Sequence, residues 1–367
     1  MPKTLRILGT RGIPAQHGGF ETFAEHFALF LVKKGWRVIV YCQEDAGTDT
    51  TCSEWEGIER VHIPVSQSGA FGTIVFDWKV TVHAAAHKDL LLTLGYNTAV
   101  FCVLFRLKGL TNLINMDGIE WKRGKWSLMA RTWLYLNERA GCWLGNHLVA
   151  DHPEIENHLA TRVSRQKITM LPYGSDALTD CDAALLDAYG LQPGQYALVI
   201  ARPEPENSIL EIVMAFSRHI RRKKLMVLGD FDKASPAYRE QVFAAASGEV
   251  VFPGAIYDAA TVQALRYFAT AYVHGHQVGG TNPSLVEALG AGSPVIAHDN
   301  KFNRWVAGPD NLYFENVDRC CELFDRIFAD QDLCNAIRAA NQQRHRTLFT
   351  WDTINQQYLQ LIEQFDF

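Results

Sequence analysis

The chain has 367 residues, of which 48% are hydrophobic and 20% charged, and its formal net charge is −5 at pH 7. This length predicts two domains, each with enough apolar residues for a core of its own. The charge argues against a general nucleic-acid-binding protein, and the most apolar run, residues 98–105, is too short to span a bilayer. Eight scattered cysteines without a C-x-x-C pair, and an N-terminus that enters a strand directly, favour reduced thiols and a cytoplasmic location.

The chain opens with a strand, a glycine-containing loop, a helix and a second strand. The first strand covers residues 5–8, and Gly18 and Gly19 end the loop that follows it. The helix begins at Phe20, and the next strand covers residues 37–41. This order is typical of doubly wound α/β domains, in which ligands bind at the carboxyl ends of the strands. The loop lacks the G-x-G-x-x-G spacing, which disfavours an NAD site.

Two acidic residues follow a later strand of this half. A strand over residues 113–116 ends at Asp117, and Glu120 comes three residues later. Since ligands are expected at strand ends, both carboxylates are candidates for acceptor binding or catalysis. The alternative is that they cap or solvate the loop before the next helix.

Residues 121–143 combine aromatic and basic side chains, with four tryptophans, one tyrosine and five Lys or Arg residues. A helix of this composition could rest on an anionic membrane surface. The alternative, which we weigh slightly higher, is an ordinary amphipathic helix with its tryptophans in the core.

The second half repeats the strand, loop and helix order. We predict a boundary near residue 182, so that residues 1–182 form one domain and residues 183–349 the other, with a C-terminal helix over 350–367 packing back on the first. Arg202 follows a strand over residues 196–201 and precedes a helix. It could clamp a diphosphate by charge-assisted hydrogen bonds, or pair with Glu204 or Glu206 on the surface.

Residues 272–299 hold the strongest local signal. A short strand is followed by a loop of small and polar residues and then by the start of a helix. Pro283 suits the first turn of this helix, and Asn282 or Thr281 suits its N-terminal cap. The first turn of a helix offers unpaired N–H groups to an anion, and Glu287 lies where a carboxylate could bind sugar hydroxyls. The alternative is a capped surface helix with no ligand.

Four stretches together resemble the family 4 glycosyltransferases of GT-B fold, most closely the rhamnosyltransferase-type subgroup of bacterial surface polysaccharide synthesis. They are GTRGIPAQHGGFETFAEHFA, NMDGIEWKRGKW, ARPEPENS and HGHQVGGTNPSLVEALGAGSPVIA, and the likeness extends over nearly the whole chain. The resemblance implies two Rossmann-like doubly wound domains facing a central cleft.

The resemblance also implies roles for individual residues. Glu287 matches the second of two glutamates spaced eight apart and would hold the nucleotide ribose, whereas Gly279 stands where the first would be. Arg202 matches the diphosphate-binding arginine, and Asn207 stands where a lysine is usual. The remaining positions implied for the donor are Gly18, Gly19, Tyr257, His276, Gly280, Thr281, Asn282, Pro283, Ser284 and Leu285. Asp117 and Glu120 are expected on the acceptor side, and Asp117, Arg202 and Glu287 are the expected catalytic residues.

The function implied is transfer of a sugar, most closely L-rhamnose from dTDP-β-L-rhamnose, to a glycan or lipid-linked acceptor with retention of configuration. No cofactor or metal is expected; a dTDP- or UDP-linked sugar is the substrate, and no nucleic acid is a partner. We expect a cytoplasmic enzyme, at the inner face of the plasma membrane if residues 121–143 contact lipid. The alternatives are a transferase for another UDP- or GDP-sugar, a sugar-nucleotide epimerase or hydrolase, a non-catalytic nucleotide-sugar-binding protein and, least favoured, an NAD-dependent oxidoreductase.

Overall fold

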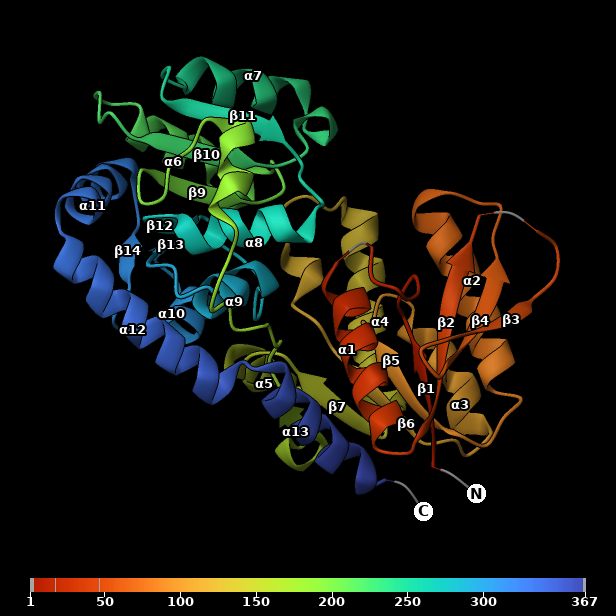
Figure 1. Ribbon diagram of the computed structural model, residues 1–367. Helices are drawn as coiled ribbons and strands as arrows, with labels where there is room; N and C mark the ends of the chain where they lie inside the picture. The colour runs from red at the N-terminus through yellow and green to blue at the C-terminus, as the bar shows by residue number, and fades with distance from the viewer. Residues whose placement is uncertain (1–2, 17, 46, 366–367) are drawn as a thin grey trace. The chain divides into compact units, whose positions relative to one another are not determined.

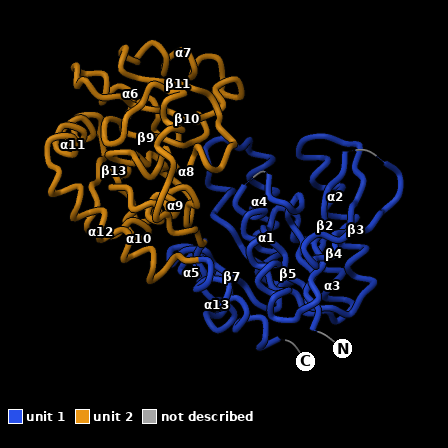
Figure 2. The backbone as a smooth tube through the Cα atoms, in the orientation of Figure 1, with its two compact units in different colours: residues 1–173, 351–367 blue, residues 174–350 orange. Residues whose placement is uncertain are grey.

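The computed structural model describes residues 3–16, 18–45 and 47–365. The chain divides into two compact units, drawn in two colours in Figure 2. Unit 1 comprises residues 1–173 together with 351–367, and unit 2 comprises residues 174–350. The division falls nine residues before the expected boundary at 182, and the C-terminal helix is counted with unit 1.

Unit 1 is built on a sheet of eight described strands in the order β3-β4-β2-β1-β5-β6-β7-β8 (Figure 1). All neighbours are parallel except β3 and β4, which form an antiparallel hairpin. The strands are β1 (Thr4–Leu8), β2 (Arg37–Glu44), β3 (Thr51–Trp55), β4 (Ile58–Pro64), β5 (Leu90–Leu94), β6 (Asn112–Asn115), β7 (His147–Ala150) and β8 (Ile168–Met170).

The helices of unit 1 connect these strands and cover the sheet. They are α1 (Gly19–Lys33), α2 (Gly69–Ala84), α3 (Val103–Leu107), α4 (Leu128–Leu144), α5 (Pro153–Leu159) and α13 (Trp351–Glu363), with the short 3₁₀ helices η1 (Ala99–Cys102), η2 (Glu120–Lys122) and η3 (Arg165–Lys167). Helix α5 is capped by the side chain of His152, which accepts a hydrogen bond from the Glu154 N–H.

Helices α1 and α13 pack together on unit 1 through aromatic side chains. Phe23 and Phe27, four residues apart on α1, are buried, and both rings contact Tyr358 of α13. The Tyr358 hydroxyl accepts a hydrogen bond of 2.9 Å from the Asn115 amide at the end of β6. The burial of these rings supplies the apolar contact that holds the last helix to unit 1.

Unit 2 is a parallel sheet of six described strands in the order β11-β10-β9-β12-β13-β14. The strands are β9 (Tyr196–Ile200), β10 (Lys224–Leu228), β11 (Val250–Gly254), β12 (Ala271–His274), β13 (Val295–His298) and β14 (Leu312–Phe314). The helices are α6 (Ile209–Phe216), α7 (Pro236–Ala245), α8 (Ala259–Phe268), α9 (Pro283–Gly290), α10 (Lys301–Ala307), α11 (Val317–Ala329) and α12 (Gln331–Leu348), with η4 (Ala183–Tyr189), η5 (Pro205–Asn207) and η6 (Phe231–Lys233).

The strands of both sheets read as nearly continuous apolar runs because helices cover both faces. Residues 197–199 of β9 and 225–227 of β10, for example, are almost completely buried. Such runs are typical of parallel sheets in doubly wound folds. The two Rossmann-like domains predicted from the sequence are therefore confirmed.

Candidate functional site

The strand order of unit 2 has a switch point between β9 and β12. From β9 the chain moves outward through β10 to β11, and it then returns to the opposite side of β9 for β12, β13 and β14. Doubly wound folds bind their ligands at the carboxyl ends of the two strands on either side of such a point. The loops that follow these strands cover residues 201–208 and 275–282, which contain half of the donor-binding residues predicted from the sequence.

Arg202 lies in the first of these loops with an exposed side chain. Its guanidinium pairs with no carboxylate among the residues that the structure describes, so the surface pair with Glu204 or Glu206 is not formed. Its main-chain carbonyl accepts a hydrogen bond of 2.8 Å from the Asn207 side-chain amide. Asn207 is 4% exposed, so in this structure it supports the Arg202 loop from inside.

The two loops of the switch point are joined to each other. The Gln277 backbone N–H donates to the Glu206 carbonyl at 2.9 Å, and the Gln277 side-chain amide donates to the Ser208 hydroxyl at 2.9 Å. A side chain at Gly275 would place its Cβ only 2.1 Å from the Asn207 carbonyl oxygen, so the close approach of the loops requires glycine there.

Helix α9 begins as the sequence predicted, with Asn282 as its cap and Pro283 in its first turn. The Asn282 side-chain oxygen accepts a hydrogen bond of 3.0 Å from the Ser284 N–H. The Leu285 N–H donates to the Asn282 carbonyl at 3.1 Å. Both amides predicted to meet a phosphate are therefore used in capping, and an anion would have to share them or displace the cap.

The residues between β12 and α9 include the position where the first family glutamate would stand. Gly279 has a φ of +140°, a backbone conformation that residues other than glycine rarely adopt. The backbone of a glutamate at this position would therefore be strained. Gly280 is half-buried and Thr281 is buried. The His276 carbonyl, nearer the strand, accepts hydrogen bonds from the side-chain amides of Asn300 at 3.0 Å and Asn303 at 2.8 Å, which tie this loop to α10.

His274 and His276 stack on each other at the end of β12. Their ring centroids are 4.3 Å apart and the planes differ by 10°. His274 is 1% exposed, and among the described residues neither of its ring nitrogens has a hydrogen-bond partner. Burial lowers the pKa of His274 well below its ordinary value, so this ring is neutral and acts as an apolar support for the His276 ring.

Glu287 belongs to a polar network that links α8, α9 and β12. Its carboxylate forms an ion pair with the buried guanidinium of Arg266. The same guanidinium donates to the Ser284 hydroxyl at 3.3 Å, and that hydroxyl lies 2.8 Å from the Tyr272 hydroxyl. Arg266 and Tyr272 were not predicted as members of the site; the only signal was that Arg266 is the one charged residue of its helix.

Tyr257 lies on the loop after β11 and is 76% exposed.

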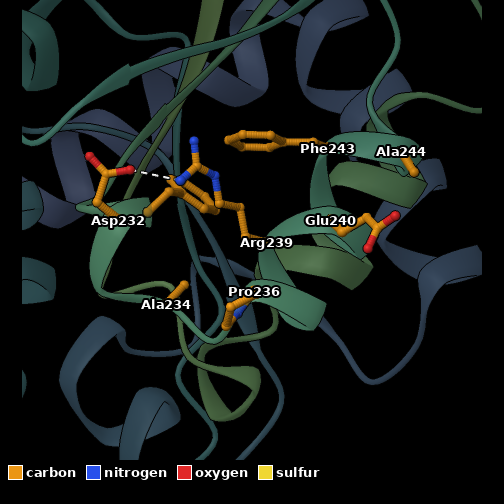
Figure 3. Close-up of a pocket in the computed structure, with 8 residues that line it drawn as sticks. Asp232, Ala234, Pro236, Arg239, Glu240, Phe243 and Ala244 are labelled. Atoms are coloured by element: carbon orange, nitrogen blue, oxygen red, sulfur yellow. Dashed lines mark hydrogen bonds and ion pairs between the residues drawn. The ribbon is translucent and has the colours of Figure 1, made fainter.

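An open cavity of about 420 Å³ lies between η6 and α7. Figure 3 shows Arg239 in this cavity between Asp232, to which it is hydrogen-bonded at 2.7 Å, and the ring of Phe243. None of the residues predicted for the donor lines this cavity, so it is separate from the predicted site.

In unit 1 the switch point lies between β1 and β5, and the loop after β1 leads to Gly18 and Gly19. Gly18 precedes α1 with a φ of +112°, and Gly19 is the first residue of that helix. Two carboxylates of α1 hold the loop: Glu21 accepts a hydrogen bond from the Arg11 N–H at 3.1 Å, and Glu25 from the Ala15 N–H at 2.6 Å. Neither glutamate was predicted to have a role here.

Asp117 follows β6 and is half-buried, with a left-handed backbone conformation at φ +50°. Its N–H donates to the Asn115 side-chain oxygen at 3.0 Å. Burial, and secondarily the nearby charge of Glu120, raise the pKa of the Asp117 carboxyl to about 6. A left-handed backbone and a raised pKa at a strand end are typical of functional carboxylates.

Glu120 is already engaged within its own loop. Its carboxylate forms an ion pair of 2.8 Å with Arg123 and accepts a hydrogen bond of 3.2 Å from the Trp126 indole. Its backbone N–H donates to the Tyr96 hydroxyl at 2.9 Å. These contacts give Glu120 a structural role in the loop, whereas Asp117 is the more available of the two acids.

One group of potential metal ligands occurs in the described part of the chain. Ligand atoms of His219, Cys321 and Asp325 lie within 4.8 Å of one another. The guanidinium of Arg221 donates to Asp325 at 2.9 Å and to the Cys321 sulfur at 3.1 Å. Because this cation already occupies the group, it does not suit a metal ion.

Residues 2–176 match a family model described as a domain of unknown function, DUF1972. No curated protein sequence matches the chain significantly. Among solved structures, the chain resembles sucrose-phosphate synthase from Thermosynechococcus elongatus, with a TM-score of 0.81 and 19% identity over 99% of both chains.

Two other solved structures are similar over nearly their whole length. HepE from Anabaena, in complex with UDP and glucose, has a TM-score of 0.78 and 14% identity, over 99% of this chain and 100% of that chain. A UDP-forming α,α-trehalose-phosphate synthase from Burkholderia xenovorans, in complex with glucose-6-phosphate, has a TM-score of 0.73 and 12% identity, over 97% and 99%. At these identities the likeness establishes the fold, which is GT-B.

Proposed function

We propose that this chain is a retaining glycosyltransferase that moves a sugar from a nucleoside diphosphate donor to a glycan or lipid-linked acceptor. The observation that carries the proposal is the arrangement at the switch point of unit 2. An exposed arginine, Arg202, follows one strand, and a capped helix start with Glu287 follows the adjacent strand. HepE, which shares the fold, was solved with UDP and glucose, the two parts of such a donor.

The roles follow from the chemistry of the donor. Arg202 is assigned to the diphosphate, since a guanidinium matches two phosphate oxygens. Glu287 is assigned to the hydroxyls of the nucleoside sugar, of which dTDP offers only the 3′-hydroxyl. The candidates to contact the donor sugar are His276, Gly280, Thr281 and Asn282, and Tyr257 is the candidate to contact the base.

In the reaction, the bond between the anomeric carbon and the diphosphate oxygen breaks, and its electron pair moves to the diphosphate. The acceptor hydroxyl oxygen forms the new bond to the anomeric carbon on the same face, and its proton passes to a leaving phosphate oxygen. Arg202 stabilises the negative charge that develops on the diphosphate, as preorganised donors do. We assign Asp117 and Glu120 to the acceptor side, with Asp117 able to orient an acceptor hydroxyl. Since Arg202 supplies the positive charge, the proposal includes no metal ion.

For the sugar we propose L-rhamnose from dTDP-β-L-rhamnose, in synthesis of a bacterial surface polysaccharide. Support comes from the four sequence stretches that resemble rhamnosyltransferase-type enzymes. UDP- and GDP-sugars remain the competing donors, and the screen below separates them.

The test is a thermal-shift screen of UDP, dTDP, GDP and their sugar conjugates, since a ligand that binds only the folded chain raises its melting temperature. Transfer is then measured as release of nucleoside diphosphate with and without lipid-linked acceptors. Release that needs an acceptor supports the proposal. Turnover of the donor alone would indicate an epimerase or hydrolase, and binding without turnover across the acceptor panel would indicate a binding protein.

A further inference from the structure

Helix α4 of unit 1 exposes a stripe of large apolar side chains. Met129, Trp133, Leu136 and Trp143 are 83%, 38%, 57% and 74% exposed. Their spacing of four, three and seven residues places them on one face of the helix. One expectation for residues 121–143 was an ordinary amphipathic helix with its tryptophans in the core. Trp143 lies largely in solvent, so such a helix does not account for the stripe.

Two further helical regions of unit 1, α2 and the segment formed by η1 and α3, repeat the pattern. On α2, Phe71, Trp78 and Val82 are exposed at intervals of seven and four residues. Across η1 and α3, the exposed apolar residues are Val100, Val103 and Leu107, at intervals of three and four residues. Each interval returns the side chain to the same side of its helix.

Specific contacts join the three elements into one surface. The rings of Trp78 on α2 and Phe101 on η1 meet edge to face, with centroids 5.2 Å apart. The Trp133 indole of α4 donates to the Asn97 carbonyl at 2.8 Å, and the Val100 N–H donates to the Asn137 side-chain oxygen at 2.9 Å. We call the exposed residues of α2, η1, α3 and α4 named above the apolar face. Ten large apolar side chains gathered in this way are unusual for a surface that stays in water.

The charge around the apolar face is basic. Residues 65–150 contain nine Lys or Arg and five Asp or Glu, in a chain whose formal net charge is −5. The bases at the face are exposed: Arg106, Lys108, Lys122 and Lys125. The five acidic side chains are partly or wholly buried, and Asp117 is half-buried at its strand end. The other four form hydrogen bonds or ion pairs with neighbouring side chains: Asp77 with Thr98, Asp89 with Arg6, Glu120 with Arg123, and Glu138 with His158 and Arg162.

We propose that the apolar face docks unit 1 onto an anionic lipid bilayer. Tryptophan and aliphatic side chains enter the headgroup boundary, and the surrounding lysines and arginines pair with lipid phosphates. A second copy of this chain fits the face less well, because a symmetric contact would bring the two basic borders together. In the part of the chain that the structure describes, no helix is both long and apolar enough to cross a bilayer, so the contact is peripheral. The inference does not rest on the proposed enzymatic activity.

The test is co-sedimentation of the full chain with phosphatidylcholine vesicles that contain or lack phosphatidylglycerol. Binding is expected to the anionic vesicles and to weaken with added salt. The double variant Leu136→Glu/Trp143→Glu is expected to lower the partition coefficient about tenfold or more, since it replaces inserted apolar surface with charge. Lys122→Glu/Lys125→Glu is expected to weaken binding to anionic vesicles only.

The matched control is Met214→Glu/Ile220→Glu, which changes two exposed apolar residues of unit 2 and should leave vesicle binding unchanged. Circular dichroism and melting temperature check that each variant is folded. The proposal is overturned if the chain does not bind anionic vesicles, or if the face and control variants bind equally well. It is also overturned if light scattering finds a dimer that the Leu136→Glu/Trp143→Glu variant dissociates, since the face would then belong to a second copy.

Discussion

The guanidinium of Arg266 on α8 forms an ion pair with the carboxylate of Glu287 on α9. The Arg266 side chain is 9% exposed, whereas that of Glu287 is 39% exposed. The buried partner therefore fixes the orientation of a carboxylate whose other side faces solvent. The same pair holds two helices of unit 2 together, so stability and ligand binding have to be separated when Glu287 is changed.

Glu287→Gln is expected to weaken binding of the nucleoside diphosphate about tenfold or more, because the proposed charge-assisted hydrogen bond to a hydroxyl of the nucleoside sugar is lost. The substitution should also lower the free energy of unfolding by about 1–2 kcal/mol. This loss is smaller than for a fully buried ion pair, because Glu287 is partly exposed to solvent. Calorimetry with UDP and with inorganic pyrophosphate isolates the ribose role, since pyrophosphate binding should stay unchanged. If the binding of both ligands is weakened equally, the substitution acts through the fold and not through a contact with the nucleoside sugar.

Arg202→Ala is expected to weaken UDP and pyrophosphate binding alike, by about tenfold to a hundredfold, because the diphosphate loses a charged donor. Melting temperature without ligand should hardly change, since the side chain is exposed and makes no ion pair in the described chain. Arg326→Ala, an exposed arginine of α11, is the matched control. Binding by Arg202→Ala at the strength of the parent chain would remove Arg202 from the site.

Asn207→Lys tests whether the lysine that the family resemblance implies at this position could serve here. The Asn207 amide is buried and donates to the Arg202 carbonyl, so a lysine would lose that bond and desolvate its ammonium. We expect about 2 kcal/mol lower stability and weaker UDP binding, measured by urea unfolding and calorimetry. Tighter UDP binding by the variant would show instead that the ammonium reaches the phosphates.

The sequence predicted the two doubly wound halves because their apolar strands and glycine loops are local signals. It missed β3, since most of this edge strand is exposed and it lacks an apolar alternation. The Arg266–Glu287 pair could not be predicted, because it depends on how α8 packs beside α9. The same holds for Asn207, whose burial results from the approach of two loops distant in sequence.

Asp117→Asn tests the raised pKa of this carboxyl. Burial raises it to about 6 in the folded chain, against about 3.9 when unfolded, so the folded state holds the proton more tightly. The stability that this protonation contributes is present below pH 4 and is lost as the pH rises from about 4 to 6. Asparagine cannot ionise and tolerates the left-handed backbone at φ +50°, so the variant should be more stable than the parent above pH 6, by at most about 2–3 kcal/mol.

Urea unfolding at pH 4 and pH 8 measures this difference, with Glu54→Gln, an exposed acid of the same unit, as the control. The urea unfolding curves of Asp117→Asn and the parent should nearly coincide at pH 4. At pH 8 the curve of the variant should lie at higher urea concentration. A variant less stable than the parent at pH 8 would show that the ionised carboxylate stabilises unit 1, which contradicts the prediction. If the variant is instead more stable but transfers sugar poorly, Asp117 is retained at a cost in stability, as expected for a carboxylate that serves the reaction.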